Sequence, residues 1–151
     1  MKRRAFLLGG FAIAGVLGLA GANRMTFYSM VTEPRSGEVV DAAEAYELVE
    51  SGDLVLVDIR RPDEWLKTGR ALGSVPIDMR RDDFTDELSR IVNGKNNTRI
   101  ALICARGVRS ARLSNRLIEA GFDNIVDVPE GMLGSESGPG WIARGLPLVE
   151  G

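Results

Sequence analysis

The chain has 151 residues, with 19 Lys and Arg against 21 Asp and Glu, one cysteine and no histidine. An acidic balance without a long basic run argues against a nucleic-acid-binding protein. A single cysteine excludes an intramolecular disulfide, and the length suits one domain with one core.

The first 22 residues resemble an export signal. Lys2-Arg3-Arg4 forms a charged start, residues 5–20 are apolar and glycine-rich, and Ala20-Gly21-Ala22 is a small-x-small cleavage site. The paired arginines resemble the twin-arginine signal of bacterial export. We therefore expect cleavage after Ala22 and a soluble, periplasmic or otherwise exported domain. The alternative is an uncleaved, outward-facing membrane anchor, because the apolar stretch approaches the length that spans a bilayer.

The rest of the chain alternates short apolar runs with helical patterns. Residues 23–37 lack periodicity and are predicted to be a linker, followed by one domain over residues 38–151. The expected strands are 39–40, 54–57, 74–77, 100–103 and 125–126. The expected helices are 42–50, 62–65, 84–92 and 110–120. An exposed turn is expected over 93–97, and a helical turn over 141–143. This alternation predicts an α/β fold, a small parallel sheet flanked by helices on both faces.

Two polar residues follow the strongest strands. Asp58 comes after the apolar run 54–57, and Cys104 comes after the run 100–103. Because ligands of such sheets bind outside the carboxyl ends of the strands, we expect both residues at one functional edge.

The loop that begins at Cys104 has the features of an anion cradle. A strand ends in the thiol, Gly107 lies in the turn, and a helix follows, so unpaired backbone N–H groups and the helix dipole favour a negative charge there. Flanking by Arg106 and Arg109 favours the thiolate further. An inert core cysteine is the alternative, but two arginines this close do not suit a dry core.

These motifs together resemble a single-domain rhodanese, a sulfurtransferase, over about residues 38–149. The resemblance rests on Asp58-Ile59-Arg60, Glu64-Trp65, the loop Cys104-Ala105-Arg106-Gly107-Val108-Arg109-Ser110, and Trp141 followed by Gly145-Leu146-Pro147. Two segments depart from the family pattern. Arg70 stands where the family usually has a histidine, and the 134–140 loop looks longer than usual.

The resemblance implies a transfer in two steps through a persulfide on Cys104. A small sulfur-containing anion such as thiosulfate would be the donor, and the acceptor would be a thiol, cyanide or a partner protein. We expect no cofactor, no metal, no nucleic-acid partner and no stable membrane insertion after cleavage. Arg106 is the expected substrate contact, and Arg109 would pair with an oxyanion or brace the loop. The backbone of Ala105, Gly107 and Val108 would complete the cradle. Asp58 and Arg60 are expected to give structural support as an ion pair or as caps rather than to act on substrate.

Three alternatives stay open beside the sulfurtransferase. Cysteine phosphatases and arsenate reductases also surround an anion with Cys and Arg, but they carry five residues between the two, and this chain has four. A non-enzymatic periplasmic sulfur carrier would share every motif. A protein-binding rhodanese-like module without activity is disfavoured by the intact cysteine.

Overall fold

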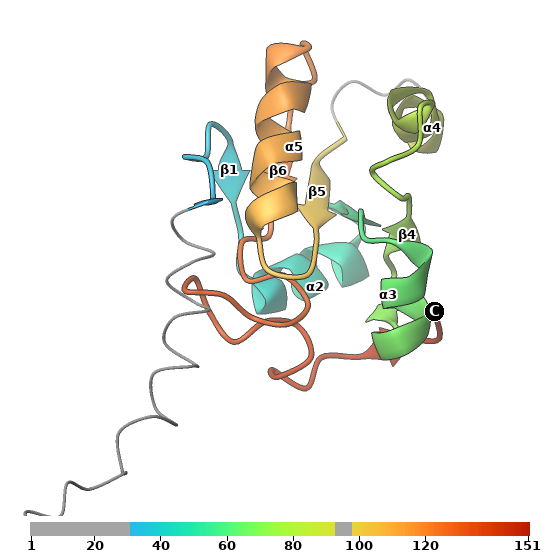
Figure 1. The fold of residues 1–151 in the computed structure, drawn as a ribbon, viewed down its shortest axis with the longest axis vertical. Coiled ribbons are helices and arrows are strands. Elements are labelled where there is room, and N and C mark those ends of the chain that lie inside the picture. Colours follow the sequence, from blue (N-terminus) through green and yellow to red (C-terminus); the bar gives the residue numbers. More distant parts are fainter. Residues whose placement is uncertain (1–30, 93–97) are drawn as a thin grey trace, which may run out of the picture.

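A computed structural model describes residues 31–92 and 98–151, and these form one α/β unit (Figure 1). The predicted export signal and the predicted turn over 93–97 lie outside the described residues. Among the helices of the described ranges, none is long and apolar enough to cross a membrane.

The predicted parallel sheet is confirmed. Its five strands lie in the order β1-β6-β5-β2-β4, and all neighbours are parallel. The strands are β1 (Glu38–Val39), β2 (Val55–Asp58), β4 (Val75–Pro76), β5 (Ile100–Ile103) and β6 (Ile125–Asp127). All four residues of the central strand β5 are buried, as a strand covered on both faces requires.

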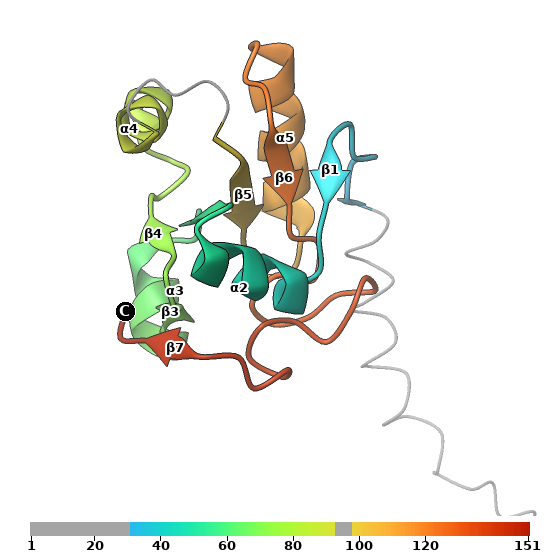
Figure 2. The ribbon, with the colours of Figure 1, turned by 180° about the vertical axis from the view of Figure 1, so that it is seen from behind.

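Helices cover both faces of the sheet, as predicted. They are α2 (Ala42–Ser51), α3 (Pro62–Thr68), α4 (Phe84–Ile91) and α5 (Val108–Glu119). The two views from opposite sides place α5 on one face and α2 on the other (Figures 1 and 2). Successive strand residues therefore alternate between two cores. Leu56 packs with Ala45 and Trp141 on the α2 face, whereas Val57 packs with Leu88 and Leu117 on the face of α4 and α5.

Local signals explain where the helices begin. The Asp41 side chain accepts a hydrogen bond of 2.9 Å from the Glu44 N–H, which caps α2 as a short polar side chain before a helix does. Pro62 occupies the first turn of α3, where its missing N–H costs nothing. Helix α5 starts at Val108 rather than at Ser110, because Gly107 turns the chain directly into the helix with φ of +79°.

One element was not expected from the sequence. Strands β3 (Arg70–Ala71) and β7 (Leu148–Val149) form a separate antiparallel pair, which ties the end of the chain to the segment after α3 (Figure 2). Two-residue strands carry too little pattern to be recognised in a sequence. Residues 141–145 form turns rather than the expected helical turn over 141–143.

Candidate active site

The register of the sheet brings Asp58 and Cys104 to one edge. Asp58 on β2 pairs with Ile103 on β5, so the two chains leave the sheet side by side. The Ile59 N–H donates to the Ile103 carbonyl over 3.0 Å and extends the pairing by one residue. The predicted common edge of the sheet is therefore confirmed.

The loop after β5 wraps around the thiol. The Gly107 N–H donates to Cys104 Sγ over 3.2 Å, and the Ser110 hydroxyl oxygen lies 3.6 Å from the same sulfur. Only glycine fits position 107, because its φ is +79° and a Cβ there would come within 2.1 Å of the Pro129 carbonyl oxygen. Cys104 itself is 1% exposed, so access to the sulfur is narrow.

A second loop, around residues 131–133, contacts the backbone of the loop after β5. The N–H groups of Met132 and Leu133 each donate over 2.9 Å, to the carbonyls of Cys104 and Ala105 respectively. A Cβ on Gly131 would come within 2.6 Å of the Ala105 backbone, so this position also needs glycine. The loop after β5 is thus held in place by backbone contacts that its own sequence does not reveal.

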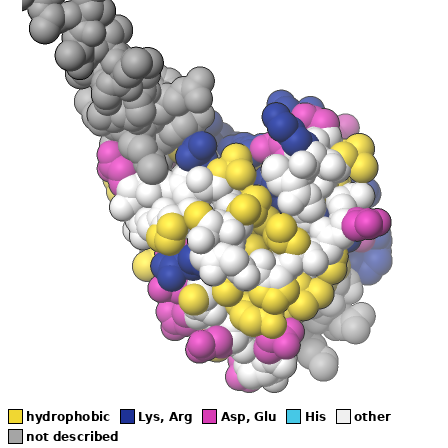
Figure 3. Space-filling model, turned by 90° about the horizontal axis from the view of Figure 1, so that it is seen from below, with side chains coloured by type: hydrophobic (Ala, Val, Ile, Leu, Met, Phe, Trp, Pro, Cys, Tyr) yellow, Lys and Arg dark blue, Asp and Glu magenta, His cyan; other side chains and the backbone are white. Residues whose placement is uncertain are grey.

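A pocket of about 390 Å³ opens over the thiol. It is lined by Glu64, Cys104, Ala105, Arg106, Val108, Arg109 and Leu133. Most of the predicted substrate-binding residues therefore surround one space, while Gly107 contributes its N–H to the sulfur. On the underside of the domain, hydrophobic side chains gather between charged ones (Figure 3). Leu133 at the pocket is 41% exposed, and Leu66 on α3 is 75% exposed.

The two loop arginines each bind other groups of the protein. Arg109 forms two short hydrogen bonds with the Glu64 carboxylate, of 2.7 and 2.6 Å. Arg106 lies in the pocket lining, where it was expected to contact substrate, and it also donates through Nη1 to the carbonyls of Leu133 and Gly134, at 3.3 and 3.0 Å. The bracing of backbone carbonyls that was expected of Arg109 is therefore provided by Arg106.

The ion pair of Arg109 with Glu64 determines the ionisation of both side chains at the pocket. Burial raises the pKa of Glu64, but hydrogen bonds from Arg109 and from the Arg61 N–H outweigh it, and the net shift of this pKa is downward. The pKa of Arg109 is raised, chiefly by its hydrogen bond to Glu64 and also by the charge of Cys104. Both partners therefore stay ionised beside the thiol at neutral pH.

The expected ion pair of Asp58 and Arg60 is present and buried. Arg60 Nε and Nη2 donate to the Asp58 carboxylate at 2.7 to 3.1 Å, Nη1 donates to Thr68 Oγ1, and Nη2 also donates to the Gly69 carbonyl, the last two both at 2.8 Å. With all these donors satisfied, the pair joins β2 to the end of α3. It lies outside the pocket lining, in agreement with a supporting role.

Sequence reasoning missed two residues as members of the site. Glu64 was noted only as part of a motif, although a carboxylate in the first turn of a helix beside an anion loop is a candidate partner for an arginine. Ser110 was noted only as the end of the loop motif, although one helical turn returns its side chain to the thiol. Within the described ranges, no group of three His, Cys, Asp or Glu side chains could hold a metal ion.

The chain is similar to known proteins in sequence and in fold. The Rhodanese-like domain model matches residues 41–136. A rhodanese-related protein from Thermoplasma volcanium is 30% identical, with a TM-score of 0.56, over 75% of this chain and 98% of that one. An uncharacterized protein of Rickettsia conorii is 29% identical over 118 residues, which are 70% of this chain and 92% of the relative.

The fold is also that of a known sulfur-transferring protein. The polysulfide-sulfur transferase homodimer of Wolinella succinogenes has a TM-score of 0.59 at 20% identity, over 93% of this chain and 95% of that one. The two proteins therefore share the same overall fold. With a family model covering most of the domain, the chain belongs to the rhodanese-like domain family.

Proposed function

We propose that the protein is a sulfurtransferase that moves a sulfane sulfur from a thiosulfate-like anion to a thiophilic acceptor through Cys104. The observation that carries the proposal is the thiol at the base of a pocket, with the Gly107 N–H 3.2 Å from its sulfur and Arg109 in the lining. A backbone donor aimed at sulfur stabilises a thiolate.

In the first step, the Cys104 thiolate attacks the outer sulfur of thiosulfate. A new S–S bond forms, the S–S bond of the donor breaks, and sulfite leaves with the electron pair. In the second step, cyanide or a thiolate attacks the terminal sulfur, the S–S bond to Cys104 breaks, and the Cys104 thiolate is restored. Neither step requires a proton transfer, which suits a chain with no histidine.

The pocket has chemistry that suits these charges. The loop N–H groups and the start of α5 favour the terminal anion of a persulfide. Arg109 and Arg106 supply positive charge at the lining, where a sulfonate-bearing donor would lie. The low exposure of Cys104 favours a thin, extended donor that reaches the thiol with one terminal atom.

Turnover of thiosulfate with cyanide tests the proposal. The wild-type protein should produce thiocyanate over many cycles, and Cys104→Ser should produce none while melting at the same temperature. Serine is nearly isosteric, but its hydroxyl stays protonated at neutral pH. Thiocyanate production by Cys104→Ser near the wild-type rate would refute the proposal.

A sulfur carrier that serves a partner protein is the second candidate. The exposed Leu133 in the lining of the pocket favours it, because an exposed apolar side chain beside a reactive group suits a protein partner. A carrier would load one sulfur per chain from thiosulfate and release it slowly to cyanide. Many rapid turnovers would favour the enzyme over the carrier.

We propose further that residues 1–22 direct the folded domain out of the cytoplasm through the twin-arginine route. Arg3→Lys with Arg4→Lys should then leave uncut precursor in the cytoplasm. Normal export of this double variant would indicate the general route instead. Full-length wild-type protein in the membrane would indicate an anchor.

A further inference from the structure

A buried carboxylate outside the pocket lining holds the loop over residues 134–140. Glu130 is 1% exposed, and its carboxylate accepts three hydrogen bonds. Arg144 donates through Nε at 2.8 Å and through Nη2 at 2.5 Å, and the Gly140 N–H donates at 2.9 Å. Arg144 also forms an ion pair of 3.5 Å with Asp41, which caps α2. The carboxylate is therefore well compensated, and it ties the end of the loop to the rest of the domain.

The loop packs directly on this carboxylate and on itself. A Cβ on Gly138 would collide with the Glu130 carboxylate, so the backbone at position 138 lies against it. Ser135 and Gly138 exchange two backbone hydrogen bonds, of 2.9 and 3.2 Å. A Cβ on Gly140 would collide with the backbone nitrogen of Gly134. The half of the loop that Glu130 holds is therefore packed on the half that begins at Gly134.

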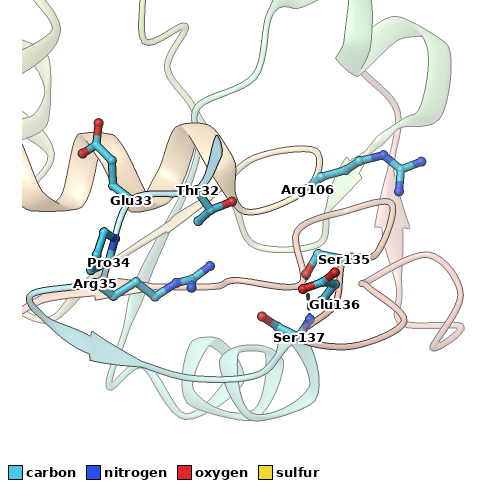
Figure 4. Close-up of a pocket in the computed structure, with 8 residues that line it drawn as sticks. All are labelled: Thr32, Glu33, Pro34, Arg35, Arg106, Ser135, Glu136 and Ser137. Carbon is cyan, nitrogen blue, oxygen red and sulfur yellow. Dashed lines mark hydrogen bonds between the residues drawn. The ribbon is translucent and has the colours of Figure 1, made fainter. Parts of the chain in front are cut away.

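Gly134 connects the loop with Arg106 at the pocket over the thiol. The carbonyls of Gly134 and Leu133 accept hydrogen bonds from Arg106 Nη1, at 3.0 and 3.3 Å. Arg106 lines the pocket over the thiol, and it also lines a second pocket, of about 230 Å³, with residues 135–137 at the tip of the loop (Figure 4). A continuous series of contacts therefore joins Glu130 to the wall of the pocket over the thiol.

We propose that Glu130 is a positioning residue for Arg106, and that by holding the 134–140 loop it sets the preference of the pocket for an anion. The carboxylate holds residues 138–140, these hold Gly134, and the Gly134 carbonyl holds the guanidinium. A guanidinium held in one place supplies its positive charge to an incoming anion without reorganisation. The proposal rests on the proposed binding of an anionic sulfur donor in this pocket.

The charge of Glu130 and its contacts with the loop have opposite effects on an anion. A carboxylate repels an incoming anion, so the loss of its charge alone would make the pocket more attractive to anions. Loss of the loop contacts makes the pocket less attractive, because Arg106 then loses the carbonyl that holds it at the lining. The direction of the change in Glu130→Gln therefore separates the two effects.

The ratio of the alkylation rates of Cys104 by iodoacetate and by iodoacetamide at pH 7 measures this preference. Both reagents attack the same thiolate and differ by one negative charge, so the ratio cancels changes in thiol reactivity. Glu130→Gln should lower the ratio at least about twofold, and Arg106→Ala should lower it about three- to fivefold. The double variant should fall no further than Arg106→Ala alone, because both changes act on the same guanidinium. Alkylation needs no sulfur donor, so this readout stays intact even if the protein proves unable to transfer sulfur.

Asp127→Asn is the matched control. Asp127 is a second buried carboxylate, 2% exposed, with an arginine partner that is 27% exposed, against 1% for Glu130 and 28% for Arg144. Its partner, Arg35, belongs to the segment before β1 and not to the 134–140 loop. The control variant should therefore leave the ratio at the wild-type value or slightly above it.

Three results would overturn the proposal. The first is an unchanged or higher ratio in folded Glu130→Gln, because the loop would then have no effect on the anion preference. The second is an equal fall in Asp127→Asn, because any buried carboxylate would then have the same effect. The third is a further fall when Glu130→Gln is added to Arg106→Ala, because Glu130 would then act by another route.

Gly138→Ala keeps the proposal testable if Glu130→Gln does not fold, as judged by circular dichroism. The added Cβ would collide with the Glu130 carboxylate, so the loop and the carboxylate must move apart, and no charge changes. This variant should lower the ratio in the same direction as Glu130→Gln. A wild-type ratio in folded Gly138→Ala would contradict the proposal.

Discussion

Arg109 and Glu64 form a two-bond ion pair between α5 and α3 at the pocket over Cys104, with distances of 2.7 and 2.6 Å. The two residues lie 45 positions apart in the sequence, so the pair joins two separate helices, and both side chains are partly exposed. It therefore fixes the position of the arginine while it reduces the net positive charge that the pocket presents to an anion.

The Arg109–Glu64 pair predicts a stability difference that depends on pH. Burial raises the pKa of Glu64, but hydrogen bonds from Arg109 and from the Arg61 N–H lower it further, so the net shift is downward. The ionised carboxylate therefore stabilises the folded state at pH values above the pKa of Glu64 in the unfolded chain. This stabilisation is lost as the pH falls through the lower pKa of Glu64 in the folded protein. Glu64→Gln should therefore melt below the wild type at pH 7, and the two melting temperatures should converge toward pH 3. Thermal unfolding followed by circular dichroism at both pH values measures this, and a constant gap would contradict it.

The two loop arginines should differ in how they affect donor binding. Arg109→Ala leaves the Glu64 carboxylate with only the longer ion pair to Arg61, at 3.6 Å, beside an incoming anion. The KM for thiosulfate should therefore rise by about one to two decades, since a charge-assisted contact is worth about 1.5–3 kcal/mol. Arg106→Ala removes the contacts to Leu133 and Gly134, and it should lower the melting temperature more than it raises KM. Steady-state kinetics with thermal melts separate the two; equal effects of both variants on both quantities would refute the division of roles.

Gly107 should tolerate no side chain. Gly107→Ala combines an unfavourable φ of +79° with a Cβ at 2.1 Å from the Pro129 carbonyl oxygen, and it should both destabilise the protein and abolish transfer. Gly52→Ala is the matched control, because φ is +81° there but nothing lies within 4 Å of the added Cβ. That control should cost only about 1–2 kcal/mol in unfolding free energy, measured in urea, and keep full activity. Equal stability of the two variants would show that the close approach to Pro129 is unimportant.

The buried pair of Asp58 and Arg60 should matter far more to stability than an exposed pair. Arg60→Ala leaves a carboxylate buried without its partner and should cost about 3–5 kcal/mol of unfolding free energy. Arg81→Ala breaks an exposed pair with Asp83 at 2.7 Å and should have little measurable effect, because solvent screens such pairs. Urea unfolding of both variants compares them, and an equal loss would contradict the structural role of Arg60.

Much of the domain could be predicted because its signals are local. The apolar runs around Leu56 and Leu102 mark the two central strands, and the cap at Asp41 marks the start of α2. The loop that begins at Cys104 supplies most of the residues that line the pocket over the thiol. Parallel pairing then brings Asp58 and Cys104 to one edge, since the carboxyl ends of parallel strands meet there.

The remainder depends on contacts between segments far apart in sequence. Three such contacts at the site have no signal in the local sequence. They are the ion pair of Arg109 with Glu64, the hydrogen bonds of Arg106 to carbonyls 27 and 28 residues away, and the close approach of Gly131 to Ala105. The pair of β3 with β7 is likewise set by tertiary packing, because two-residue strands have no usable periodicity. The sequence therefore indicates which residues form the cradle, but not which partners hold them.

Intact mass spectrometry after incubation with thiosulfate tests the central claim, a persulfide on Cys104, most directly. The account predicts a mass increase of about 32 Da, one sulfur atom, that disappears on treatment with a reducing thiol and is absent from Cys104→Ser. An unchanged mass of folded wild-type protein, or the same adduct on Cys104→Ser, would contradict it.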